Sequence, residues 1–123
     1  MTKQDEFEIR QSITEYESSL IPQVLAAYSG IGPQIVISDR LYEQAIEEDQ
    51  DEIIKLRYEQ FTELLGMILD LNEFFLVACS YMKELSKLVD NSDTEALCDM
   101  YEGKFSMHRE LLEEKNLWMD EFD

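Results

Sequence analysis

The chain has 123 residues and a formal net charge of −18, because 28 Asp and Glu side chains oppose 10 Lys and Arg. Its hydrophobic content of 45% and aromatic content of 11% exceed those of a disordered acidic polymer, so we predict a single folded domain over residues 1–123. An acidic surface with ten scattered cations would repel phosphates, which disfavours direct binding of nucleic acid.

The first predicted element is an amphipathic helix. Apolar residues recur at steps of three and four from Phe7 to Tyr28, and this spacing traces one helical face. Pro22 lies inside the pattern; because proline lacks an N–H and clashes with the preceding turn, we expect a kink or a division near Leu20. Residues 29–33 hold two glycines and a proline, so we expect residues 29–37 to form a loop or an extended connector.

Residues 38–90 are predicted to form two helices or three. Ser38 is a suitable N-cap for a short helix, and the polar residues 47–51 are compatible either with a tight turn or with an exposed arc of one continuous helix. A heptad-like apolar stripe then faces a partner helix. Its members are Ile54, Tyr58, Phe61, Leu65 and Ile68. Between Gly66 and Asn72 we favour a helix break.

The last helix is predicted to begin at Ser92. Ser92 and Glu95 have the spacing of a capping box, in which each side chain bonds the backbone N–H of the other. The helix ends in an acidic, aromatic tail, residues 116–123. No second strand candidate accompanies the short β-branched run at residues 35–37, so we predict an all-α fold, a small antiparallel bundle of four or five helices.

The location of the protein is predicted from its apolar segments and cysteines. The N-terminus lacks the basic start and apolar run of a secretory signal. Three polar residues, Asp70, Asn72 and Glu73, interrupt the most apolar stretch (64–82), which we therefore interpret as a core helix rather than a membrane span. Cys79 and Cys98 lie among apolar residues, and we expect both to be buried and reduced. We predict a cytoplasmic protein without membrane contact.

Residues suited to catalysis or to a cofactor are sparse. The single histidine, His108, lies on an apolar stripe, and we expect it at the edge of the core, bound to a carboxylate or a carbonyl. One histidine and two distant cysteines make no zinc motif. Residues 91–102 place oxygen-bearing side chains at the ligand spacing of a calcium-binding loop. However, Ala96 occupies the position where the sharp turn of such a loop requires glycine. The sequence therefore predicts no enzyme, no metal site and no cofactor.

Apolar residues exceed what one core stripe per helix needs, which indicates a binding face for another protein. Amphipathic bundles with spare apolar surface take up a partner's amphipathic helix in a groove, while rim charges steer the encounter. Tyr42 is one candidate for this face. The others are Met100, Met107, Leu117, Trp118, Met119 and Phe122. A homodimer that closes the same surface is the alternative.

The architecture resembles that of the small acidic all-helical chaperones of flagellar and type III export systems. Residues 109–115, Arg-Glu-Leu-Leu-Glu-Glu-Lys, form a phrase that is similar to theirs. The resemblance implies a non-catalytic chaperone or adaptor that binds a helix of its partner, and it assigns a role to no single residue.

The acidic residues allow a second function. A solvated helix face accounts for them, but carboxylates at phosphate-like spacing also suit an inhibitor that occupies the basic nucleic-acid-binding site of a defence or regulatory protein, as phage-encoded mimics do. Such an inhibitor would show its carboxylates along one elongated face. The candidate residues are Glu43, Glu47, Glu48, Asp51, Glu52 and Glu59.

Overall fold

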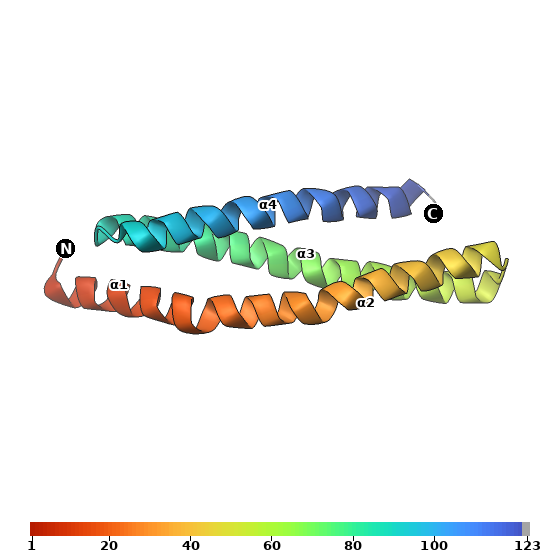
Figure 1. The fold of residues 1–123 in the computed structure, drawn as a ribbon, viewed down its shortest axis with the longest axis horizontal. Coiled ribbons are helices and arrows are strands. Elements are labelled where there is room, and N and C mark those ends of the chain that lie inside the picture. Colours follow the sequence, from red (N-terminus) through yellow and green to blue (C-terminus); the bar gives the residue numbers. More distant parts are fainter. Residues whose placement is uncertain (122–123) are drawn as a thin grey trace.

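The protein is all-helical in its described part. Its structure, a computed structural model, describes the backbone of residues 1–121 and the side chains of residues 1–114. The helices are α1 (Lys3–Glu15), α2 (Ile21–Glu47), α3 (Asp51–Leu88) and α4 (Ser92–Glu121), and a π-helical segment (Tyr16–Leu20) joins α1 to α2 without a break. Over residues 1–121 there are thus three long helices, the first of them bent, rather than the four or five predicted (Figure 1). The all-α class is confirmed.

The π-helical segment lies where the sequence predicted a kink. Pro22 is in the first turn of α2, directly after this segment. A proline ring clashes with the carbonyl of the residue four positions earlier, and a wider turn moves that carbonyl away. The helix therefore changes its geometry near Leu20 and continues instead of dividing.

Residues 29–37 are helical, so the predicted connector is wrong. Gly30, Gly32 and Pro33 all lie inside α2. Keeping this stretch helical costs about 1 kcal/mol for each glycine and about 3 kcal/mol for the proline. In return, the apolar stripe of α2 continues through it and packs against α3. Ile35 and Tyr42, which are 7% and 4% exposed, are buried as a result, and each buried side chain contributes about 1.5–3 kcal/mol.

The predicted helix start at Ser38 is wrong for the same reason. Ser38 is buried in the middle of α2 and caps no helix. The predicted break between Gly66 and Asn72 is also wrong, because α3 runs through both residues. Burial of Ile68 and Asn72 between neighbouring helices holds this stretch in helical form.

Two similar turns connect the long helices. Asp49 and Asp90 each adopt a φ of 54°, a left-handed conformation in which a helix typically ends. The next residue closes each turn: the N–H of Gln50 donates to the carbonyl of Ala45 (3.2 Å), and that of Asn91 to Ser86 (2.9 Å). Of the two options for residues 47–51, the structure therefore has the tight turn.

Helix α4 begins at Ser92 as predicted, but its cap is one residue earlier. The side-chain oxygen of Asn91 accepts a hydrogen bond from the N–H of Thr94 at 3.1 Å. The cap satisfies one of the free N–H groups at the start of a helix. It fixes the point from which α4 runs back along α3.

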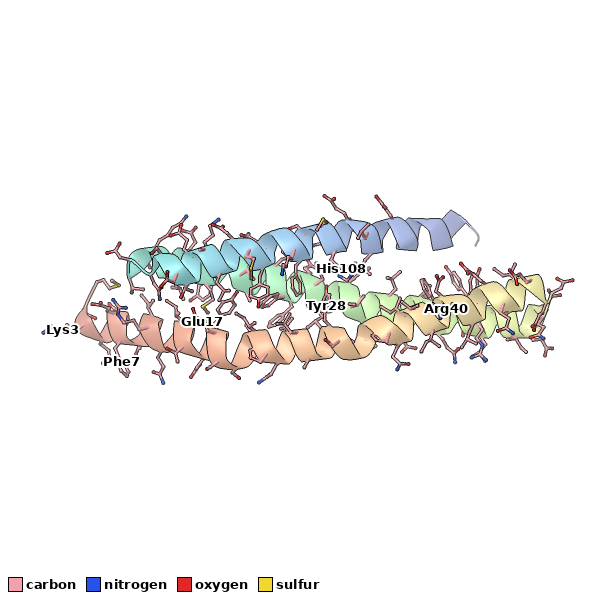
Figure 2. All side chains as sticks on the ribbon, in the orientation of Figure 1. Lys3, Phe7, Glu17, Tyr28, Arg40 and His108 are labelled. Carbon is pink, nitrogen blue, oxygen red and sulfur yellow. The ribbon has the colours of Figure 1, made fainter. Side chains whose placement is uncertain are left out.

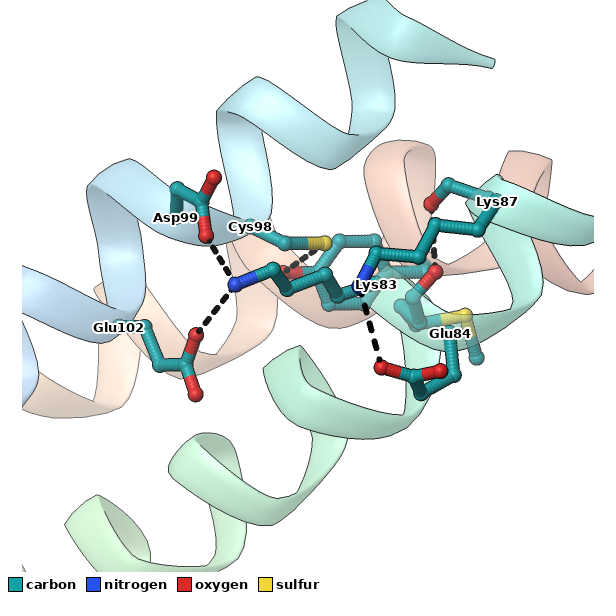
Figure 3. A network of polar contacts seen from close by, with 9 residues as sticks. Lys83, Glu84, Lys87, Cys98, Asp99 and Glu102 are labelled. Carbon is teal, nitrogen blue, oxygen red and sulfur yellow. Dashed lines mark hydrogen bonds and ion pairs between the residues drawn. The ribbon is translucent and has the colours of Figure 1, made fainter. Parts of the chain in front are cut away.

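Helix α3 is the central element. Its backbone packs closely against both α2 and α4, which lie on either side of it (Figure 1). Near the α3–α4 turn, Lys83 Nζ lies 2.5 Å from Asp99 Oδ1 and 3.9 Å from Glu102 Oε2 (Figure 3). These ion pairs join α3 to α4 along one edge.

The core has two parts along the length of the bundle. An aromatic part joins the π-helical segment, α2, α3 and α4 around Tyr16, Phe75 and Phe105. An aliphatic-rich part lies between α2, α3 and the later turns of α4. Its buried members are Ile35, Tyr42, Phe61, Leu65, Ile68 and Leu112. Large aromatic side chains separate α2 from α4 in the first part: the rings of Tyr28 and Phe105 are 4.8 Å apart.

Candidate functional site

An open apolar groove lies between α2 and α4, with α3 as its floor. Its main hollow has a volume of about 610 Å³, and a second hollow of about 320 Å³ continues it and shares His108 and Leu111 with it. Helix α2 contributes Tyr28, Gly32, Ile35, Val36 and Glu43, α3 contributes Ile68, and α4 contributes Lys104, Phe105, Met107, His108, Leu111, Leu112 and Glu114. We call this the α2–α4 groove.

The groove follows from two neighbouring stripes on each flanking helix. On α2, Ile35 points to α3 and is buried, whereas the adjacent Val36 is 51% exposed. On α4, Leu112 is buried and the adjacent Leu111 is 58% exposed. Neighbouring residues on a helix are separated by about 100°, so the second member of each pair forms a wall of the groove. Both walls are apolar and accessible.

A buried polar network supports one side of the groove. Asn72 is fully buried, and its Nδ2 donates to the hydroxyl of Tyr28 and to the carbonyl of Phe105, both at 2.8 Å. The Tyr28 hydroxyl lies 3.4 Å from Nδ1 of His108 (Figure 2 labels both residues). Burial raises the pKa of Tyr28. The prediction for His108 is therefore right in its place, at the edge of the core, and wrong in its partner, which is a hydroxyl.

This network orients the imidazole of His108. The Tyr28 oxygen accepts from Asn72, and its own proton is free to point at Nδ1 of His108. His108 is half-buried and lines both hollows of the α2–α4 groove, so it supplies a polar group within an apolar wall.

The predicted apolar site residues are divided by the structure. Met107 lines the groove and is 63% exposed, whereas Met100 is exposed at another position of α4. Tyr42 was a wrong candidate, because it is buried against Tyr58. Among the remaining candidates, Leu117, Trp118 and Met119 lie in α4 beyond the described side chains, and Phe122 lies outside the described residues.

Sequence reasoning missed most of the groove and named only Met107 and Glu43 among its lining residues as candidates. Val36 was assigned to the short β-branched connector, and Leu111 counted only as part of the phrase at 109–115. A helical reading through residues 29–37 would have placed Gly32, Val36 and Glu43 at steps of four and seven on one face. The glycines and the proline concealed that signal.

The six acidic candidates are all exposed and gather at the α2–α3 turn. Glu43 additionally lines the groove. Within the described residues no group of three or more His, Cys, Asp or Glu side chains has a metal-binding arrangement. Asp70 and Glu73 face solvent on α3 and share no pocket. The six acidic candidates at the α2–α3 turn thus form an acidic surface at one end of the molecule.

The two cysteines share one buried partner. Tyr16 Oη lies 3.2 Å from Sγ of Cys79 and 3.7 Å from Sγ of Cys98, and both cysteines are free and buried. Burial raises the pKa of Cys79 to about 11 and also raises that of Cys98. A thiolate is the reactive form of cysteine, so this cluster is suited to packing rather than to chemistry.

Both thiols are expected to resist a disulfide reagent such as DTNB in the folded protein at pH 8 and to react in denaturant. Their folded pKa values lie above the ordinary value of 9.0. The contribution of the two thiols to the free energy of unfolding is therefore fully present below pH 9 and is lost as the pH rises toward 11. Urea unfolding between pH 8 and pH 10.5 should show this decrease. Rapid labelling of the native protein would contradict the burial of the cluster.

Two helical stretches are long and apolar enough to cross a membrane. They are residues 3–47 and α3. Core helices of soluble proteins pass the same test of length and composition, so the result is weak support for a membrane span. The predicted cytoplasmic location without membrane contact stays a prediction.

Comparison of the chain with protein-family models, with curated proteins and with solved structures finds no match.

Proposed function

We propose that this protein is a non-catalytic interaction module that binds an amphipathic helix of a partner protein in the α2–α4 groove, as a small chaperone or adaptor does. The observation that supports it is the arrangement of α2 and α4, which both pack on α3 and leave an apolar hollow of about 610 Å³ between them. A helix laid in that hollow would complete a four-helix bundle.

The dimensions of the groove suit a helix. From Tyr28 to Glu43 helix α2 spans about 22 Å, which is about four turns. Amphipathic helices insert apolar side chains at steps of three, four and seven residues. Val36, Met107 and Leu111 are more than half exposed and would be covered by such side chains. The groove thus offers apolar contact along the length of a short helix.

Charge favours a different protein over a second copy as the occupant. Each copy carries a net charge of −18, so two copies that share this face would repel each other at ordinary ionic strength. A homodimer remains the alternative to test by light scattering. The nucleic-acid mimic is less well supported, since the six carboxylates gather around the α2–α3 turn, at one end of the bundle.

Replacing Leu111 by glutamine should weaken helix binding about tenfold, because it removes a central apolar anchor of the groove. The probe is a fluorescein-labelled 18-residue helix of Leu, Ala and Lys, with affinity read by fluorescence anisotropy. Leu88→Gln is the matched control, because Leu88 is also 58% exposed but lies at the end of α3, outside the groove. This variant should bind like the unmodified protein.

Repeating the titration at high salt separates apolar docking from simple charge attraction. Apolar binding in the groove should persist when ionic attraction is screened. If Leu111→Gln and Leu88→Gln bind equally, or if all binding disappears in salt, the proposed function is wrong. Retained folding of each variant is checked by circular dichroism.

A further inference from the structure

We infer that the α2–α4 groove selects a helix with a cationic N-terminal half, and that this helix lies antiparallel to both α2 and α4. The inference rests on the proposed function and adds the charge and the direction of the partner. It is carried by the unequal charge of the two ends of the groove.

One end of the groove is acidic. Glu43 of α2 and Glu114 of α4 line the main hollow at this end, and both are exposed. The chain continues from Glu43 into the α2–α3 turn, and between residues 39 and 52 it has seven carboxylates against one cation, Arg40. Arg109, on the neighbouring turn of α4, is paired with Glu113 at 2.9 Å. A cationic segment would therefore be favoured at this end.

The opposite end of the groove carries a cation. Lys104 lines the second hollow together with Tyr28 and Phe105. Its ammonium has no ion pair among those found in the described residues. The C-terminal end of a bound helix, where free carbonyls carry partial negative charge, would be favoured beside it.

The two ends together define a direction. Helices α2 and α4 both run from the Tyr28–Lys104 end to the Glu43–Glu114 end. A guest with its positive N-terminus beside Glu43 and Glu114 runs the other way, antiparallel to both walls and parallel to α3. Neighbouring helices in an up-down-up-down bundle have this arrangement, so topology and charge favour the same direction.

The test uses two acetylated, amidated peptides of identical composition, with lysines gathered in the N-terminal half of one and, by reversal of its sequence, in the C-terminal half of the other. The first should bind about five to ten times more tightly, the effect of two or three partly screened charge contacts. A nitroxide on a residue next to its N-terminus should broaden the amide NMR signals of Glu43 and Glu114, and a nitroxide on a residue next to its C-terminus should broaden those near Lys104.

Substitution tests the charges directly. Glu43→Gln combined with Glu114→Gln should reduce the preference to about twofold or less. The matched control, Asp70→Asn combined with Glu73→Gln, removes two exposed carboxylates from α3 and should leave the preference unchanged.

The outcomes separate the inference from the proposed function. Equal affinities of the two peptides, or an N-terminal label beside Lys104, would overturn the direction while helix binding in the groove stands. Failure of both peptides to bind, or binding that is unaffected by Leu111→Gln, would overturn the proposed function as well.

Discussion

Replacement of Phe75 by alanine is expected to lower the free energy of unfolding by about 4 kcal/mol, which is typical of a fully buried phenylalanine. Phe75 is completely inaccessible. Its ring packs against aromatic rings of the π-helical segment and of α4: the centroid distances are 6.2 Å to Tyr16 and 4.6 Å to Phe105. The truncated side chain would leave a cavity where the three long helices meet, and rigid neighbours would fill it only in part.

The adjacent residue gives a matched control. Phe74 has the same side chain on the same helix but is 54% exposed, so Phe74→Ala should change stability by about 0.5 kcal/mol or less. Chemical denaturation followed by circular dichroism measures both variants. Similar losses for the two would mean that α3 presents a different face to the core.

Replacement of Asn72 by aspartate is expected to destabilise the protein by about 3–5 kcal/mol at pH 7, because it buries an unpaired carboxylate. The amide of Asn72 donates to the carbonyl of Phe105, and a carboxylate in that place would face the carbonyl with no proton to share. The Tyr28 hydroxyl is the remaining nearby donor. The substitution also removes the hydrogen bond that orients Tyr28 toward His108.

The cost of Asn72→Asp should depend on pH in a defined direction. Burial raises the pKa of a carboxyl group in the folded state, so the loss is small near pH 4 and grows by about 1.4 kcal/mol per pH unit above the ordinary pKa. Urea unfolding of variant and unmodified protein between pH 4 and pH 7 measures the difference. Asn72→Leu, which has similar volume and no charge, should show a cost that is independent of pH.

Both substitutions also test how the groove is formed. The aromatic core holds α2 and α4 apart near Tyr28 and Phe105, and the network from Asn72 to His108 holds the polar edge of the groove. Loss of either is expected to weaken binding of the Leu, Ala and Lys helix even under conditions where the variant is fully folded. Binding that is fully preserved in folded Asn72→Asp would separate the network from the site.

The local signals in the sequence determined the helical class and several positions within it. The spacing of Phe61, Leu65 and Ile68 predicted the buried face of the first half of α3, because residues three and four apart lie on the same side of a helix whatever packs against it. Pro22 likewise marked the irregular segment before α2, because its effect is confined to one turn. The start of α4 at Ser92 could be predicted for the same reason, and its cap to within one residue.

The tertiary structure alone decided where the helices continue and which apolar residues remain outside. Glycine and proline disfavour a helix by about 1–3 kcal/mol each, and contacts with α3, distant in sequence, outweigh that cost between residues 29 and 37. The groove is what remains after the core has formed: Tyr42 is buried, whereas Val36 and Leu111 are exposed. Spacing within one helix shows that two apolar stripes exist, but only the position of the neighbouring helices determines which of them is covered.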